Sequence, residues 1–348
     1  MKVLIIVPSL VPKGPVRVFI TLAKYLRLSG VNVDIWYFDD LQGALKESAT
    51  KVNFWKKADF SSFNVIQSVG LRPDLFVRRN KSRNHQPCVT TMENYVEEDF
   101  YYEYGAYKAK IFAPIWKYAV QKHDKVVVLQ EHMKEYYQNN WGLKNLEIIG
   151  NCTEAIPALM EPNVQSRILE FKGNRTLAAS IGLVTNRKGL QQVAHLLVLM
   201  PSLVWVHLGD GKDMPQLKSI VNELGIKDRV LFLGNTPNAS AYLKHANLFL
   251  MPSYSEGMPL AMLEAVMQEL PCVSTNLPVF QAIFNNDQVG QFTPGDIEEF
   301  KSIVEHVLSA PKSYTSKALE RYNQEYAPES VAAKYIELYT SLIQNHEG

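Results

Sequence analysis

Residues 248–275, LFLMPSYSEGMPLAMLEAVMQELPCVST, constrain the fold of this chain more than any other stretch. The apolar run Leu248–Met251 predicts a short buried strand. Pro259 suits the first turn of a helix, because its missing N–H would have no partner there. Pro271 ends that helix, and a second strand begins at Cys272. A strand, a glycine loop, a helix and a strand in succession are typical of an α/β fold with a doubly wound sheet.

The start of this predicted helix is a candidate anion site. Free backbone N–H groups and roughly half a positive charge from the helix dipole favour a phosphate there. Gly257 allows a ligand to approach the backbone closely. Glu256 and Glu264 flank the site, and because carboxylates repel phosphate, we interpret them as acceptors for hydroxyl groups. A ligand with hydroxyls at both ends and phosphates between them is a sugar nucleotide.

The pattern S-x-x-E-G-x-P-L-x-x-L-E-A, from Ser253 to Ala265, resembles the signature of the retaining Glu-x7-Glu glycosyltransferases, glycosyltransferase family four. The alternative is an ordinary amphipathic helix with two solvated glutamates. The resemblance implies the GT-B fold: two doubly wound Rossmann-like domains facing a cleft, with a C-terminal helix that crosses back to the first domain. It also implies that Glu256 holds hydroxyls of the donor sugar and Glu264 those of the ribose. The expected diphosphate contacts are the backbone groups of Gly257, Met258, Pro259 and Leu260.

The stretch IGLVTNRKGL, residues 181–190, resembles the family's second diphosphate loop, in which an arginine and a lysine stand six residues apart. Lys188 occupies the lysine position, but Gly182 occupies the arginine position. One lost charge-assisted contact costs about 1.5–3 kcal/mol of donor binding. Arg187 is the candidate substitute, although adjacent residues on an extended loop tend to point apart. The alternative for Lys188 is a surface lysine at a turn.

The first half of the chain opens with a similar unit. Val3–Val7 predicts a parallel strand covered on both faces, and a glycine loop, a helix and the strand from Val31 to Phe38 follow. The family usually has two glycines in this loop, whereas Pro15 takes the second place here. The remaining donor-binding candidates, which the resemblance places in glycine loops after strands, are Gly14, Gly209, Gly234 and Asn235.

Glu93, in the segment PCVTTMENY, stands where the family usually has a histidine close to the reacting sugar. We predict that Glu93 faces the donor sugar or the acceptor hydroxyl, and the alternative is a loop glutamate exposed to water. With Glu256 and Lys188, it completes the set of catalytic candidates.

Length and composition narrow the class further. A chain of 348 residues exceeds the size at which one core stops growing. We predict an acceptor-side domain at 1–152, a linker at 153–175, a nucleotide-sugar domain at 176–327 and a final helix at 328–348. The 36 basic residues balance 35 acidic ones, which argues against a nucleic-acid partner. Three scattered cysteines indicate a reducing compartment, so we expect a cytoplasmic protein.

Two segments are candidates for peripheral contact with the inner face of the plasma membrane or with an acceptor. Residues 72–83 are basic, and residues 100–119 are aromatic and basic. The alternatives are a solvated surface segment for the first and a core-facing helix for the second.

The resemblance implies a hexosyl- or N-acetylhexosaminyl-transferase that retains the anomeric configuration. It would move a sugar, expected to be UDP-linked, to a hydroxyl of a glycan or lipid-linked oligosaccharide in the synthesis of a surface polysaccharide such as lipopolysaccharide or capsule. No Asp-x-Asp triple and no metal-ligand spacing occur, so we expect no metal and no cofactor beyond the sugar nucleotide. A nucleotide-sugar epimerase of the same fold and a non-catalytic sugar-nucleotide-binding partner stay open as alternatives.

Overall fold

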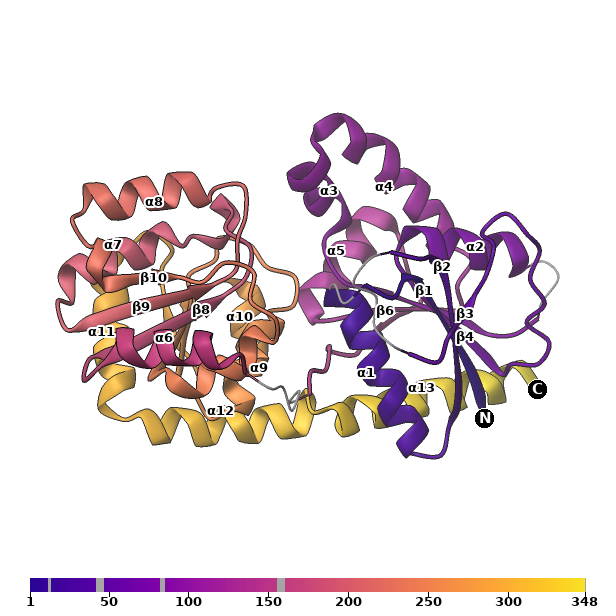
Figure 1. The fold of residues 1–348 in the computed structure, drawn as a ribbon. Coiled ribbons are helices and arrows are strands. Elements are labelled where there is room, and N and C mark those ends of the chain that lie inside the picture. Colours follow the sequence, from indigo (N-terminus) through magenta and orange to yellow (C-terminus); the bar gives the residue numbers. More distant parts are fainter. Residues whose placement is uncertain (12–13, 42–46, 82–84, 155–159, 348) are drawn as a thin grey trace. The chain divides into compact units, whose positions relative to one another are not determined.

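The structure is a computed structural model that describes residues 1–11, 14–41, 47–81, 85–154 and 160–347. The chain divides into two compact units (Figure 1). Unit 1 comprises Met1–Thr153 and Glu325–Gly348, and unit 2 comprises Glu154–Gln324. Each unit is built on one parallel sheet, which confirms the predicted α/β class with two Rossmann-like domains.

Unit 1 contains a seven-stranded sheet in the order β3-β2-β1-β4-β5-β6-β7, with every pair parallel. All five residues from Val3 to Val7 are fully buried, as a strand covered on both faces requires. The strands are β1 (Lys2–Ser9), β2 (Asn32–Asp39), β3 (Thr50–Lys51), β4 (Val65–Val69), β5 (Cys88–Met92), β6 (Lys125–Val128) and β7 (Leu146–Ile148).

The helices of unit 1 follow the apolar spacing of the sequence. In the first helix, for example, Val18, Leu22 and Leu26 recur every four residues and are buried. The aromatic and basic segment 100–119 lies on two helices, which meet at Gly105. The helices are α1 (Gly14–Leu28), α2 (Leu71–Lys81), α3 (Val96–Tyr104), α4 (Ala106–Val120), α5 (Glu131–Trp141) and α13 (Pro328–Glu347).

The last helix, α13, packs within unit 1, beside α1 (Figure 1). The Tyr335 hydroxyl lies 3.0 Å from Thr91 Oγ1 at the end of β5. The Tyr339 hydroxyl donates to Gln67 Oε1 on β4 at 3.0 Å. Both tyrosines are buried, and the ring of Tyr335 meets that of Phe19 on α1 edge to face. The predicted return of a final helix, beginning at Pro328, to the first domain is confirmed.

Unit 2 contains a six-stranded sheet in the order β10-β9-β8-β11-β12-β13, again with every pair parallel. Strands β9 and β10 extend the sheet on one side of β8, and β11, β12 and β13 extend it on the other side. The strands are β8 (Thr176–Ile181), β9 (Leu203–Leu208), β10 (Val230–Phe232), β11 (Leu248–Met251), β12 (Cys272–Thr275) and β13 (Gly290–Phe292).

Seven helices and three short 3₁₀ turns are described in unit 2 and at its end. The helices are α6 (Pro162–Lys172), α7 (Gln191–Leu199), α8 (Met214–Glu223), α9 (Leu260–Met267), α10 (Pro278–Ile283), α11 (Ile297–Ser309) and α12 (Pro311–Glu325). The 3₁₀ turns are η1 (Asn186–Lys188), η2 (Lys227–Arg229) and η3 (Ala239–His245).

The segment predicted as a linker, 153–175, differs in part from that expectation. Its residues 162–172 form α6, and Lys172 Nζ at the end of that helix donates to the His245 carbonyl at 2.8 Å. The helix begins at Pro162, since proline is favoured in a first turn. Residues 155–159 lie outside the described part of the chain.

A buried polar cluster fastens α4 to α2 and the sheet of unit 1. The Asp74 carboxylate on α2 accepts from Ser68 Oγ on β4 and from Trp116 Nε1 on α4, both at 2.6 Å. Asp74 is fully buried, and this burial raises the pKa of its carboxyl to about 6. Within the described ranges, no helix combines the length and the apolar character needed to cross a membrane.

Candidate functional site

The order of the strands in unit 2 predicts where a ligand would bind. The direction of strand addition reverses between β8 and β11, and open α/β sheets bind ligands beyond the carboxyl ends of the strands at such a reversal. Two loops leave those ends, residues 182–189 after β8 and residues 252–259 after β11. They carry the sequence-predicted candidates Arg187, Lys188 and Glu256, which the structure brings together.

Three contacts join these two loops. Lys188 Nζ lies 2.6 Å from Glu256 Oε1, the Tyr254 N–H donates to the Arg187 carbonyl at 2.8 Å, and Arg187 Nη1 donates to the Ser255 carbonyl at 3.3 Å. Arg187 and Lys188 therefore both reach the β11 loop. The expectation that these neighbours point apart was wrong, because they stand on the 3₁₀ turn η1 and not on an extended loop.

Glu256 is a buried carboxylate whose charge is balanced within the site. Only 7 % of the residue is exposed, and its Oε1 accepts from Ser253 Oγ at 2.5 Å as well as from Lys188. A buried carboxylate requires such partners, since desolvation would otherwise favour its neutral form. Glu264, on α9, is 5 % exposed. The alternative of two solvated glutamates on an amphipathic helix is thus wrong.

The predicted anion site at the start of α9 has fewer available backbone N–H groups than expected. The helix begins at Leu260, and Pro259 lies before it with φ −81° and ψ 74°. These angles are those of an inverse γ-turn, in which the Leu260 N–H donates to the Met258 carbonyl at 3.0 Å. Because Pro259 has no N–H and the Leu260 N–H has a partner, neither of these two residues offers a free backbone N–H to a diphosphate.

The β11 loop is held from behind by buried polar side chains. Gln192 on α7 is 2 % exposed, and its Nε2 donates to the Pro252 carbonyl at 2.7 Å. Thr275 Oγ1, at the end of β12, donates to the Ser253 carbonyl at 2.7 Å. A Cβ on Gly189 would lie 2.0 Å from the Pro252 oxygen, so only glycine allows the two loops to approach this closely.

A buried chain of hydrogen bonds, which the sequence did not reveal, supports the β8 loop. His207 Nε2 lies 3.1 Å from the Gly182 carbonyl and must carry the proton, because a carbonyl only accepts. His207 Nδ1 then accepts from Ser180 Oγ at 2.8 Å, and Ser180 Oγ accepts from Trp205 Nε1 at 2.8 Å. Burial lowers the pKa of His207 to about 4, so its ring is neutral near pH 7.

The candidates after β9 and β10 lie side by side. The Gly209 N–H donates to the Gly234 carbonyl at 2.8 Å, and the two glycines form an antiparallel bridge. Asn235 follows them and is exposed. A Cβ on Gly209 would lie 1.9 Å from the Gly182 oxygen, so the β9 loop also presses on the β8 loop.

Two catalytic or donor-binding candidates lie in unit 1. Glu93 Oε2 accepts from Asn151 Nδ2 at 2.5 Å, whereas its buried Oε1 has no hydrogen-bond partner among the residues that the structure describes. Burial raises the pKa of the Glu93 carboxyl to about 7, so the alternative of a water-exposed loop glutamate is wrong. Gly14 is exposed at the first position of α1.

The two candidate membrane segments differ in what they expose. On α2, Arg72 pairs with Asp39, Arg78 covers the ring of Tyr118, and Lys81 pairs with Asp124. Residues 82 and 83 lie outside the described part of the chain. On α4, by contrast, apolar side chains face outward, so a purely core-facing helix is excluded. These exposed residues are Tyr107, Ile111, Phe112, Ile115 and Tyr118.

Comparison with known proteins identifies the family to which the second half of the chain is similar. Residues 163–326 match the protein family described as "Glycosyl transferases group 1", and these residues include both loops of the site.

In the described part of the chain, no group of three or more His, Cys, Asp or Glu residues could hold a metal ion.

Two curated bacterial proteins are similar to the chain. The O-antigen biosynthesis glycosyltransferase WclY of Escherichia coli is 27 % identical over 99 % of both chains. The UDP-Gal:alpha-D-GlcNAc-diphosphoundecaprenol alpha-1,3-galactosyltransferase of E. coli is 31 % identical over 41 % of this chain and 39 % of that protein.

Solved structures confirm the fold. Anabaena HepE in complex with UDP and glucose matches with a TM-score of 0.79 at 15 % sequence identity, over 98 % of this chain and all of that one. The similarity of this chain to HepE, together with the two parallel-sheet units and the returning helix α13, establishes the GT-B fold.

The contact between the β8 and β9 loops gives a stability prediction. Gly209→Ala should lower the free energy of unfolding by about 2–4 kcal/mol, because the new Cβ would collide with the Gly182 carbonyl in a strained backbone conformation. The control is Gly225→Ala, where φ is also positive but no atom lies within 4 Å. It should cost about 1 kcal/mol. Urea unfolding followed by circular dichroism measures both, and equal losses would contradict the steric argument.

Proposed function

We propose, from the group 1 glycosyltransferase domain at residues 163–326, that this chain transfers a sugar from a UDP-linked donor to a hydroxyl of a lipid-linked glycan. The observation that carries the proposal is the ion pair between Lys188 and the buried Glu256 at the reversal point between β8 and β11. The names of the relatives, an O-antigen glycosyltransferase and a UDP-galactose enzyme acting on a diphosphoundecaprenol-linked sugar, support the donor and acceptor classes. The proposed reaction belongs to surface polysaccharide synthesis, retains the anomeric configuration and needs no metal.

The proposed chemistry uses charges that the site already holds in place. As the bond between sugar and diphosphate breaks, negative charge grows on the leaving phosphate. Lys188 and the backbone amide of Gly257 would stabilise that charge, because fixed dipoles and cations act strongly in a site screened from water. Both bonds to Glu256 end on Oε1, so its Oε2 would accept from hydroxyls of the donor sugar. Glu264 would hold those of the ribose.

Glu93 has the ionisation expected of an acid–base group in this reaction. Its pKa of about 7 lies near the working pH, where proton transfer by a side chain is most effective. We propose that the Glu93 carboxylate accepts a hydrogen bond, through its unpartnered Oε1, from the acceptor hydroxyl or the donor sugar. The exposed apolar side chains of α4 support a further proposal, that the enzyme works at the inner face of the plasma membrane.

Transfer and its stereochemistry are tested together. The chain is incubated with UDP-glucose, UDP-galactose or their N-acetylamino forms and a short-chain lipid-linked sugar acceptor. Release of UDP and a product with an α linkage are expected, without added metal and in the presence of EDTA. A β-linked product would contradict retention. Epimerised donor without acceptor consumption, or no turnover with any donor, would contradict the proposed transfer.

Lys188→Ala should weaken UDP binding roughly 10- to 100-fold, because a charge-assisted contact with the diphosphate is lost. Isothermal titration calorimetry with UDP measures this change. Lys218→Ala, which removes an exposed lysine from α8, is the control and should leave the affinity unchanged. Unaltered UDP binding by a correctly folded Lys188→Ala variant would remove Lys188 from the donor site.

Glu93→Gln should lower the transfer rate by roughly 10²–10⁴-fold and remove the rise of that rate with pH. In the unsubstituted enzyme the carboxylate is the active form, so the rate should increase as the pH passes upward through about 7. Glu98→Gln, at an exposed position on α3, is the control. Full activity in Glu93→Gln, or an unchanged pH profile, would rule out this role.

A further inference from the structure

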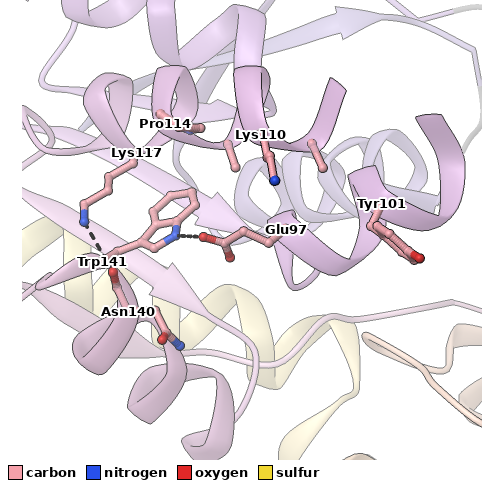
Figure 2. Close-up of a pocket in the computed structure, with 9 residues that line it drawn as sticks. Glu97, Tyr101, Lys110, Pro114, Lys117, Asn140 and Trp141 are labelled. Atoms are coloured by element: carbon pink, nitrogen blue, oxygen red, sulfur yellow. Dashed lines mark hydrogen bonds between the residues drawn. The ribbon is translucent and has the colours of Figure 1, made fainter. Parts of the chain in front are cut away.

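A pocket lies between α3, α4 and α5 of unit 1, and none of the catalytic or donor-binding candidates described above lines it. Its volume is about 670 Å³, within the range of small-molecule sites (Figure 2). One part of its wall is apolar and comes from Ala109, Ala113, Pro114 and Trp141. The other part is polar and comes from Glu97, Tyr101, Lys110, Lys117 and Asn140. The pocket is thus amphiphilic.

Two lysines give this pocket the capacity to bind an anion. Lys110 and Lys117 stand seven residues apart on one face of α4, roughly 10 Å along its axis, so their long side chains can converge on one ligand. Lys117 Nζ donates to the Asn140 carbonyl at 3.3 Å. Lys110 has no ion-pair partner among the side chains that the structure describes, and Figure 2 shows its amine pointing into the pocket.

The acidic residue of the pocket is already occupied by donors. Glu97 Oε1 accepts from Trp141 Nε1 at 2.6 Å, and its Oε2 accepts from the Tyr136 hydroxyl. These bonds hold the carboxylate against α5, as Figure 2 shows for Trp141. Among the lining residues that the structure describes, two lysines and this one carboxylate give a net positive charge, which favours an anionic ligand.

An exposed apolar stripe adjoins the pocket along α4. At 3.6 residues per turn, Tyr107, Ile111, Ile115 and Tyr118 fall within an arc of about 80°, directly beside Pro114 of the pocket. Their exposed fractions are 79, 43, 38 and 56 %. Trp116 holds the helix in this orientation from its opposite side, through its bond to Asp74. A ligand in the pocket could therefore continue onto this apolar surface, at the end of which the Arg78 guanidinium lies over the ring of Tyr118.

We propose that this pocket binds the diphosphate and first isoprene units of a polyprenyl-diphosphate-linked acceptor, whose remaining chain follows the apolar stripe of α4. The proposal rests on the proposed function for its choice of an acceptor. The two lysines fit a diphosphate, and the apolar wall and stripe fit an isoprenoid chain. Binding to a membrane surface alone would need no concave site, so the pocket favours a single ligand. A free glycan would need an exposed aromatic ring to stack on, but Trp141 in the pocket wall is only 3 % exposed.

The test is calorimetric titration of the full-length chain with farnesyl diphosphate, in the absence of any sugar nucleotide. Replacing both lysines, Lys110→Ala with Lys117→Ala, should weaken binding at least 10-fold. The control, Lys122→Ala, removes one exposed lysine just beyond α4 and should change the affinity less than twofold. Ala113→Leu fills the pocket without altering charge and should also weaken binding, while circular dichroism verifies that each variant is folded.

Three soluble competitors decide what the pocket recognises. Farnesol and inorganic diphosphate should each bind far more weakly than farnesyl diphosphate, and dioctanoyl phosphatidylglycerol should not displace it at equal concentration. Equal binding of either fragment, displacement by the phospholipid, or an undiminished affinity in the double variant would overturn the proposal. UDP binding, measured separately, should be the same in all these variants, so a failure of the donor site would be distinguished from a failure of this one.

Discussion

The ion pair between Lys188 and Glu256 is the interaction on which the candidate site depends. Its two partners come from loops that follow neighbouring strands, β8 and β11, and both side chains are largely withdrawn from water. Neither charge would be stable there alone, because burying an unpaired ion costs several kcal/mol. The pair therefore requires the two loops to stay together. The pair also places a cation beside a carboxylate. A ligand that carries both phosphate and hydroxyl groups would need these two kinds of partner.

The backbone makes this pairing geometrically feasible. Gly189 and Gly209 bring the loops after β8, β9 and β11 closer together than any side chain would allow. Neutral polar groups then satisfy the carbonyls that this close packing buries. Gln192 Nε2 donates to the Pro252 carbonyl, and His207 Nε2 donates to the Gly182 carbonyl. The hydrogen bonds of these buried groups are thus satisfied around the site, as buried polar networks require.

The sequence predicted the elements well and the local geometry poorly, for a physical reason. Val3–Val7 and Leu248–Met251 are apolar runs whose burial depends only on the fold class. The inverse γ-turn at Pro259 instead depends on the backbone angles of one residue, and the direction of Arg187 depends on a contact with a loop far away in the sequence. On α4, apolar residues lie on nearly every face, so periodicity did not reveal that one stripe is exposed.

The glycine at position 182 has backbone contacts of its own in the β8 loop. In the structure, Gly182 serves as a backbone contact: its carbonyl lies 3.1 Å from His207 Nε2, and it faces Gly209 at a distance that excludes a Cβ there. Two cations stand instead on η1, where Arg187 and Lys188 both reach the β11 loop. Two charges on one 3₁₀ turn are fixed relative to each other by three residues of backbone, whereas charges six residues apart need a longer loop to be ordered. The placement of both cations therefore depends on the order of one short turn.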